Sequence, residues 1–413
     1  MNVLYIDHYA GSETMGMEFR PYYMAKEWAK DGINTVILCA NYAHLRKKNP
    51  IIKKDLETKL IDGAQYMFLT TRHYVGNGVP RLLSMFEFIG KGMLHADDII
   101  KRFKPDVVIC SSTYPLDTYI GQRIKKKTGA LLIHEIHDLW PLSPMELGGF
   151  SKNHPFIRML QAAEISAYKH SDYIVSILPN TEPYIRSLGA QTEVVNIPNG
   201  LTAAMFDEAD AGQPDAAVRE LVQRLKAEGK FIVGYAGGIS VSNAMAVFME
   251  AMAVLKDNDR VAAVVIGEGI LKAELLAYQA SHHLDNVHFV PAIEKHKVPA
   301  TLKLMDALYI GSMKSKLYEY GVSANKIFDY MLVGAPIINA FDTKHSPMNY
   351  LGNTIECQAE NPQAIAAGIL KAMTLTEAEK TKIREESIQY VREHHHYNQL
   401  GKKFSDLFNK KEK

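Results

Sequence analysis

The chain has 413 residues, of which 47% are hydrophobic and 23% are charged, and its net charge is +1. This length exceeds one typical domain and allows two hydrophobic cores, while the near-zero net charge argues against a nucleic-acid partner. The three widely spaced cysteines, Cys39, Cys110 and Cys357, are typical of reduced thiols and not of a disulfide framework or a metal site. The first residues read directly as a strand, and no run of about 18 apolar residues occurs, so we expect a cytoplasmic protein without a transmembrane span.

Short apolar runs alternate with helical patterns through the first half of the chain. We expect these runs to be strands, at residues 2–6, 34–38, 65–69, 106–110, 130–134, 173–177 and 192–197. Strands that alternate with helices predict a mostly parallel, doubly wound sheet. The turn signal Pro198-Asn199-Gly200 and the polar, small residues at 207–217 predict a domain boundary near residues 198–215.

A second series of apolar runs fills the other half of the chain. Its expected strands are residues 231–235, 262–266, 286–290, 306–310 and 336–339. From about residue 376 the pattern is charged and helical. We therefore predict a Rossmann-like N-terminal domain over residues 1–200, a Rossmann-like C-terminal domain over residues 201–390, and a terminal helix over residues 391–413 that packs back toward the first domain.

Residues 325–336 read as one short helix that leads into a buried strand. Ser323 is the expected N-cap, and Gly334 is placed for the left-handed position after the helix. Lys326 and Asp329 are three residues apart, so an ammonium and a carboxylate project from one face of the helix. An ammonium beside a helix start suits a phosphate, and a carboxylate can accept two hydrogen bonds from a ribose diol. The alternative is an exposed salt bridge on a surface helix.

The loops after the strands of the second half carry further candidates for a nucleotide site. Gly237 and Gly238 follow the first strand and Gly267 follows the next, so backbone amides there can approach a phosphate closely. A tight turn between a strand and a helix also needs glycine. After the strand at 286–290, backbone groups around Ile293 can contact the edge of a base. Because ligands bind at the carboxyl ends of parallel strands, we expect these residues to share one site.

Several short motifs occur along the chain in an order that is similar to one known family. They are Gly11 in the loop after the first strand, Lys104-Pro105-Asp106-Val107-Val108, His137-Asp138-Leu139-Trp140-Pro141, Ile197-Pro198-Asn199-Gly200, Tyr235-Ala236-Gly237, Ile266-Gly267-Glu268-Gly269, Asn286-Val287-His288-Phe289 and residues 325–336. The ordered set spans nearly the whole chain and resembles the GT-B glycosyltransferases of the retaining family-4 type, especially those that build bacterial capsule and O-antigen. The resemblance implies an α/β fold in which two doubly wound parallel-sheet domains face each other across a cleft, with a C-terminal crossing helix.

The resemblance also implies an activity. A hexosyl or N-acetylhexosaminyl group passes from a nucleotide diphosphate donor, with UDP as the expected nucleotide, to a hydroxyl of a saccharide or of a polyprenyl-diphosphate-linked saccharide. The anomeric configuration is retained, and neither a metal nor another cofactor takes part. The implied catalytic residues are His137 and Lys326, and Gly11 and Asp138 lie in the acceptor-side loops. The implied donor-binding residues are Gly237, Gly238, Gly267, Ile293, Glu319, Asn325, Lys326 and Asp329.

For two of these residues a structural role is the alternative. His137 is then a hydrogen-bonded structural histidine near His134, and Asp138 either orients His137 or caps the turn that follows it.

Two departures from the family pattern leave other functions open. The family's first acidic residue, eight positions before Asp329, is replaced by Gly321, and Glu319 lies two residues earlier. Residues 237–243 lack the Arg and Lys that many members use to hold the diphosphate, so Lys326 is the remaining cation. One alternative is a nucleotide-sugar 2-epimerase of the same architecture. The other is a non-catalytic, nucleotide-binding subunit of a polysaccharide assembly complex.

Two sequences that resemble metal sites are interpreted otherwise. Asp257-Asn258-Asp259 has the D-x-D pattern of metal-dependent transferases, but it lies between a helix and a strand, so we expect a solvated turn. The adjacent His394, His395 and His396 point in different directions from a helix, so we expect a surface helix face. No metal site is predicted.

A basic and apolar region in the first half predicts peripheral contact with the inner face of the cell membrane. The basic residues are Arg46, Lys47, Lys48, Lys53, Lys54 and Lys59, and residues 81–89 form an apolar, partly amphipathic stretch. Together they can rest on an anionic leaflet and meet a lipid-linked acceptor. The alternative is a solvated loop followed by a helix that faces the core.

Overall fold

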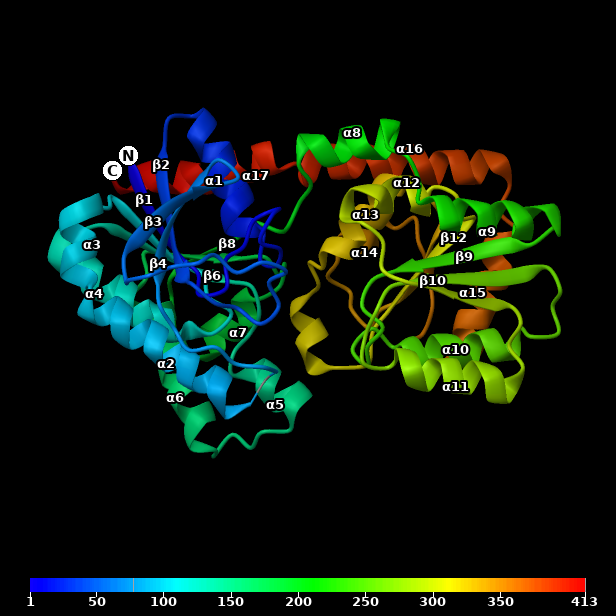
Figure 1. Ribbon diagram of the computed structural model, residues 1–413, viewed down its shortest axis with the longest axis horizontal. Coiled ribbons are helices and arrows are strands. Elements are labelled where there is room, and N and C mark those ends of the chain that lie inside the picture. The colour runs from blue at the N-terminus through cyan, green and yellow to red at the C-terminus, as the bar shows by residue number, and fades with distance from the viewer. Residues whose placement is uncertain (77, 413) are drawn as a thin grey trace. The chain divides into compact units, whose positions relative to one another are not determined.

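The structure is a computed structural model that describes residues 1–76 and 78–412. It divides the chain into two compact units, each with its own parallel sheet (Figure 1). Unit 1 contains Met1–Asn199 together with the C-terminal segment from Tyr397, and unit 2 contains Gly200–His396.

The sheet of unit 1 has the strand order β3-β4-β2-β1-β5-β6-β7-β8, in which only the β3–β4 pair is antiparallel. Its strands are β1 (Asn2–Ile6), β2 (Asn34–Ala40), β3 (Glu57–Ile61), β4 (Ala64–Leu69), β5 (Val107–Cys110), β6 (Leu131–Ile136), β7 (Tyr173–Ser176) and β8 (Glu193–Asn196). The mostly parallel, doubly wound sheet is thus confirmed. Strand β3 was not predicted, because this edge strand is partly exposed along its length and carries no buried apolar run.

Helices cover both faces of this sheet. They are α1 (Arg20–Lys30), α2 (Val79–Leu94), α3 (Ala96–Phe103), α4 (Thr118–Thr128), α5 (Leu142–Gly148), α6 (Pro155–His170), α7 (Glu182–Ser187) and α17 (Tyr397–Ser405), with 3₁₀ turns at η1 (Pro115–Asp117) and η4 (Asp406–Glu412). On one face, buried side chains of α2, α3 and α4 pack on Leu4 and Ile6 of β1. On the other face Tyr5 stacks on Trp28 of α1, whose indole Nε1 donates a hydrogen bond to the Gly401 carbonyl of α17 at 2.8 Å.

The sheet of unit 2 is wholly parallel and has the order β11-β10-β9-β12-β13-β14. Its strands are β9 (Phe231–Ala236), β10 (Val261–Ile266), β11 (Val287–Val290), β12 (Ala307–Gly311), β13 (Ile337–Ala340) and β14 (Ile355–Glu356). Its helices are α8 (Ala203–Ala211), α9 (Ala216–Ala227), α10 (Met245–Val254), α11 (Lys272–His282), α12 (Val298–Leu302), α13 (Asn325–Val333), α14 (Pro347–Leu351), α15 (Pro362–Met373) and α16 (Glu377–His394), with η2 (Lys295–Lys297) and η3 (Lys316–Tyr320).

The strand order of unit 2 contains a reversal that matters for ligand binding. From β9 the chain first proceeds outward through β10 and β11, and it then returns to the other side of β9 for β12 and β13. Helices α9, α12 and α13 cover one face of the sheet, and α10, α11 and α15 cover the other (Figure 1). The carboxyl ends of β9 and β12 therefore form a topological switch point, which is where open α/β sheets bind ligands.

Helix α13 follows the prediction at its end but not at its start. Gly334 adopts the left-handed conformation after the helix, with φ of 72°, as expected. The N-cap is Ala324 and not Ser323, which lies one residue too early and is buried. The N-cap prediction was wrong because the serine hydroxyl indicates that a cap is near but does not fix the residue at which the helix begins.

Two surface interpretations from the sequence are also corrected. His395 is buried, and its ring packs on Phe328 with ring centroids 4.5 Å apart, so the histidine run is not simply a surface face. Arg46 is buried as well, and its guanidinium donates to the carbonyls of Ala40 and Ala10, so it contributes no surface charge. Among the described residues, every helix is too short or too polar to cross a membrane.

Candidate functional site

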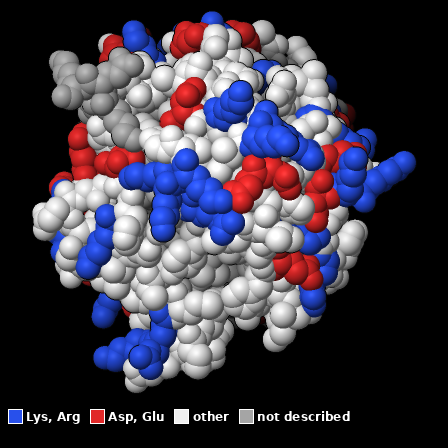
Figure 2. All heavy atoms as spheres, turned by 90° about the vertical axis from the view of Figure 1, so that its left-hand side faces the viewer, with Lys and Arg blue, Asp and Glu red and all other residues white. Residues whose placement is uncertain are grey.

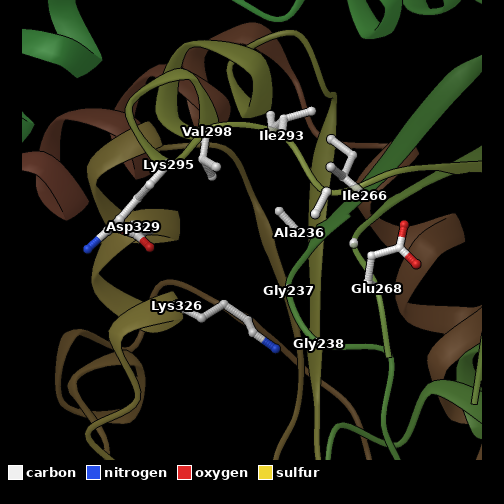
Figure 3. Close-up of a pocket in the computed structure, with 12 residues that line it drawn as sticks. Ala236, Gly237, Gly238, Ile266, Glu268, Ile293, Lys295, Val298, Lys326 and Asp329 are labelled. Atoms are coloured by element: carbon white, nitrogen blue, oxygen red, sulfur yellow. The ribbon is translucent and has the colours of Figure 1, made fainter. Parts of the chain in front are cut away.

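A pocket of about 440 Å³ opens in unit 2 at the switch point (Figure 3). The loops after β9, β10 and β11 form one side, and α13 forms the other. The lining residues are Ala236, Gly237, Gly238, Ile266, Gly267, Glu268, Ala292, Ile293, Lys295, Val298, Lys326 and Asp329. The pocket has the size and mixed apolar and polar lining of a small-molecule site.

The glycines of the pocket allow two loops to touch backbone to backbone. Gly267 has φ of 153°, and a Cβ there would lie 2.0 Å from the carbonyl oxygen of Gly237. Gly237 itself has φ of 151°, and a Cβ on it would lie 3.0 Å from Cε of Lys326. The amide of Gly237 donates to the Ile266 carbonyl at 3.0 Å. The close loop contact therefore explains Gly237 and Gly267 without a ligand, and Gly238 is the better placed amide for a phosphate.

Lys326 points into the pocket from the first turn of α13 (Figure 3). Its Nζ donates to Tyr235 Oη and to Asn243 Oδ1, both at 3.0 Å. Both acceptors are neutral, and no carboxylate among the described residues lies within ion-pair distance of Nζ. Burial lowers the pKa of Lys326 to about 8. This ammonium is thus held in place but lacks a countercharge, which a bound anion can supply.

Asp329 lies one turn further along α13 and lines the same pocket. Burial raises the pKa of its carboxyl group to about 6, although the positive charge of Lys295 opposes the shift. Figure 3 shows the Lys295 side chain extending toward Asp329. Lys326 is bonded to Tyr235 and Asn243 instead, so the alternative of an exposed Lys326–Asp329 salt bridge does not describe this helix.

The structure brings together six of the eight predicted donor-binding residues: Gly237, Gly238, Gly267, Ile293, Lys326 and Asp329. Two others lie outside the pocket lining. Glu319 is exposed on η3, and Asn325 is exposed at the start of α13. Gly321 has φ of 98°, so the backbone favours glycine where the family carries its first acidic residue.

Several residues that line the pocket were not predicted from the sequence, and Lys295 is the most important of them. It follows β11 by five residues, in the same position relative to the sheet as the glycine loops after β9 and β10. The rule that ligands bind beyond the carboxyl ends of strands could have found it. Glu268 was seen only as part of a glycine motif, and its carboxylate pairs with Lys272 at 2.7 Å.

In unit 1, His137 lies just after β6 in a buried polar network. Its Nε2 contacts Glu135 Oε2 at 3.1 Å and Ser111 Oγ at 2.8 Å, and its Nδ1 faces Glu18 Oε2 at 3.6 Å. Burial alone would lower the pKa of His137, but the hydrogen bonds to Glu135 and Glu18 outweigh burial and raise it to about 10. Because a carboxylate faces each ring nitrogen, His137 is an imidazolium that donates hydrogen bonds and cannot act as a base.

Glu135 is the centre of this network. Burial would raise the pKa of Glu135, but Arg20 and His137 hold it well below its usual range. Arg20 Nε bonds to Glu135 Oε1 at 2.9 Å, and the rest of its guanidinium donates to the carbonyls of Ile197 and Pro198. Arg20 thereby ties the His137 network to the end of unit 1. Neither Arg20 nor Glu135 was predicted, because their contact spans 115 residues of sequence.

The two residues predicted for the acceptor-side loops have structural contacts. A Cβ on Gly11 would lie 1.9 Å from the Gly16 carbonyl oxygen, and the Gly11 amide donates to the Glu18 carbonyl at 3.1 Å. Gly11 thus lets the loop fold so that Glu18 reaches His137. Asp138 accepts hydrogen bonds from the Leu139 amide and the Ser143 hydroxyl, so its carboxylate caps the turn that leads into α5.

The fold and the pocket define a two-domain α/β protein with a pocket at the switch point of its second domain. Family comparison gives two matches: "Glycosyltransferase Family 4" over residues 15–204 and "Glycosyl transferases group 1" over residues 230–374. The chain is therefore a glycosyltransferase, with a family 4 domain in its first half and a group 1 domain in its second. The resemblance of the motifs to family-4 glycosyltransferases is thus confirmed at the level of the domain families. Comparison with the sequences of curated proteins gives no match.

Solved structures show the GT-B fold. HepE from Anabaena, in complex with UDP and glucose, aligns with a TM-score of 0.67 at 14% identity over 98% of this chain and 99% of HepE. Sucrose-phosphate synthase from Thermosynechococcus elongatus gives 0.73 at 15% identity over 98% of both chains. A trehalose-6-phosphate protein from E. coli, bound with UDP-2-fluoro glucose, gives a TM-score of 0.69 at 11% identity over 99% of both chains. At such identities the similarity concerns the fold.

Proposed function

We propose that this glycosyltransferase moves a sugar from a UDP-sugar to a hydroxyl group and retains the anomeric configuration. The observation that carries the proposal is the Lys326 ammonium, which is fixed by two neutral oxygens and has no carboxylate partner among the described residues. A diphosphate supplies the missing countercharge, and a ribose one helical turn away can donate two hydrogen bonds to Asp329. A nucleoside diphosphate presents both groups.

The residues of the pocket match the charge that develops during sugar transfer. As the glycosidic bond to the donor breaks, negative charge accumulates on the departing diphosphate. Lys326, the start of α13 and the Gly238 amide can stabilise this charge, and loss of one such preorganised contact costs roughly 3–4 kcal/mol of barrier. The leaving phosphate can accept the proton of the acceptor hydroxyl on the same face. No carboxylate nucleophile and no metal is then required.

In this proposal His137 acts on the transferred sugar through its positive charge, because both of its ring nitrogens already face carboxylates. An imidazolium beside Glu135 and Glu18 keeps its charge at neutral pH, so it suits charge stabilisation and not proton abstraction. Uracil is the expected base because the structures of HepE and of the E. coli protein contain UDP or a UDP-sugar analogue.

The proposed setting is the synthesis of a bacterial surface polysaccharide, such as capsule or O-antigen, at the inner face of the cell membrane. The acceptor is then a saccharide or a saccharide linked to polyprenyl diphosphate. The motif resemblance supports this setting, as does the basic and apolar region of unit 1.

A non-catalytic nucleotide-binding subunit is the second candidate. The left-handed backbone at Gly321 favours it, because the acidic side chain that the family places there is absent. A measured sugar-transfer activity would distinguish the working glycosyltransferase from the non-catalytic subunit.

The test is donor turnover with a panel of UDP-sugars and a simple saccharide acceptor, followed by proton NMR of the product. The proposal predicts consumption of one donor, a product with the donor's anomeric configuration, and about a hundredfold or greater loss of rate in Lys326→Ala. Lys344→Ala, at an exposed lysine of the same unit, is the matched control and should retain the wild-type rate. Binding of UDP without any turnover would favour the non-catalytic subunit.

A further inference from the structure

Helix α2 of unit 1 exposes an apolar face. Val79, Leu83, Phe86 and Leu94 recur at helical spacing along it, and between 38% and 74% of each residue is exposed. Gly90 is exposed between them. The opposite face packs into the core through Met85 and Phe88. The helix is thus apolar on both faces, and a helix of this kind is expected to be covered on both.

Two loops of unit 1 also expose aliphatic side chains. His44 Nδ1 lies 3.2 Å from Tyr74 Oη, and this contact joins the loop after β2 to the loop before α2. The next residue in each loop is an exposed aliphatic side chain, Leu45 and Val75 respectively. Each of the two loops that this contact joins thus adds an exposed aliphatic side chain to unit 1.

Basic residues border the apolar face. Residues 41–127 contain sixteen Lys and Arg against eight Asp and Glu, although the whole chain has a net charge of only +1. Glu87 of α2 is paired with Arg72 at 2.6 Å, and Asp55 is paired with Lys91 of α2 at 3.1 Å. Lys47, Lys48, Lys53 and Lys54 are exposed.

Figure 2 shows the side of the molecule on which α2, α3 and α4 lie. Lys and Arg side chains gather across the middle of this side together with Asp and Glu side chains, and much of the surface below them is uncharged. Helix α2 packs against both α3 and α4, and the last turns of these two helices carry basic residues, of which Lys125 pairs with Asp172 and Lys127 with Asp97.

We propose that the apolar face of α2 docks on an anionic lipid leaflet. Val79, Leu83 and Phe86 would enter the boundary between headgroups and acyl chains, and the bordering lysines would contact anionic headgroups. Two copies of this surface would bring like charges together, which disfavours self-association as the reason for the exposed face. The inference rests on the proposed transfer to a lipid-linked acceptor and names the surface that reaches it.

Vesicle flotation tests the proposal with the full chain. Wild-type protein is expected to float with vesicles of phosphatidylcholine and phosphatidylglycerol and to remain below vesicles of phosphatidylcholine alone. Leu83→Ser and Phe86→Ser should each weaken binding about tenfold, since each removes a side chain that the bilayer boundary would bury. Leu276→Ser and Leu370→Ser, at positions in unit 2 that are 42% and 41% exposed, are matched controls and should bind as wild type does.

Several results would overturn the docking surface. They are no binding of wild type to anionic vesicles, equal binding to uncharged vesicles, and unchanged binding of the α2 variants. Dimerisation of the wild type that both variants abolish would assign the face to a second copy instead. Nucleotide binding and transfer to a soluble saccharide are measured in parallel. They should be unchanged in the α2 variants, so that failure of the docking proposal is distinguishable from failure of the proposed function.

Discussion

Asp329→Asn removes the charge of the carboxyl group that we assign to ribose and keeps its size. Burial raises the pKa of Asp329 to about 6 in the folded chain, against an ordinary value of 3.8. A carboxyl group with a raised folded pKa stabilises the fold while it is protonated, so this contribution is complete below about pH 4 and is lost as pH rises through 6. The ligand-free variant should therefore be more stable than wild type at pH 7, by about 1–3 kcal/mol after allowance for partial exposure.

Donor affinity should change in the opposite direction. The ionised fraction of Asp329 falls from about nine-tenths at pH 7 to about one-tenth at pH 5, so wild-type affinity should fall about tenfold over this range. Asp329→Asn cannot ionise, so its affinity should not vary with pH. At pH 7 it should bind about tenfold more weakly than wild type, because hydrogen bonds to a neutral acceptor are weaker than those to a carboxylate.

The assay is calorimetric titration with UDP-glucose at pH 5, 6 and 7. The phosphates of UDP-glucose do not titrate in this range, whereas the terminal phosphate of UDP, with a pKa of about 6, does. Denaturant unfolding of the ligand-free protein gives the stability at each pH. The exposed Asp342→Asn serves as the control, with wild-type behaviour expected. A flat wild-type profile, or the same slope in Asp329→Asn, would refute the assignment of Asp329.

Other substitutions probe the rest of the site. Lys326→Met removes the ammonium that faces the diphosphate, so it should weaken UDP binding at least about tenfold in calorimetry and leave uridine binding unchanged. In the wild type, the affinity for UDP should decline above pH 8, because the Lys326 ammonium deprotonates there. Glu135→Gln should lower the pKa of His137 from about 10, as nitrogen-15 NMR of the imidazole would show, whereas an unchanged value would contradict the role of that carboxylate. Gly267→Ala places a methyl group 2.0 Å from a carbonyl oxygen of the neighbouring loop and should cost about 2–4 kcal/mol in denaturant unfolding. Gly63→Ala, which also has positive φ but open space, should cost only about 1 kcal/mol.

Much of the architecture follows from local sequence. The buried strands appear as short apolar runs because parallel strands are covered on both faces. Helix α13 ends at Gly334 because only a residue that tolerates the left-handed conformation fits there. Lys326 and Asp329 share a pocket because helical spacing places both on one face.

The partners of the functional groups could not be read in this way. Arg20, Glu18 and Glu135 converge on one network from distant parts of the chain. Their charge state depends on burial that only the fold creates. The sequence predicted an apolar, partly amphipathic stretch at residues 81–89, but it did not say which face of that helix the core leaves uncovered.

A thermal-shift screen of the ligand-free protein against UDP, GDP, ADP, CMP and TDP, without and with magnesium, tests the nucleotide site most directly. We predict a selective shift with UDP that does not depend on magnesium. At about 100 times the dissociation constant it should correspond to about 2.7 kcal/mol of added stability. Lys326→Ala and Asp329→Ala should each reduce the shift by about half or more, and Lys344→Ala should preserve it. No shift with any nucleotide, or a shift that survives both pocket substitutions, would contradict the assignment of this pocket to the donor.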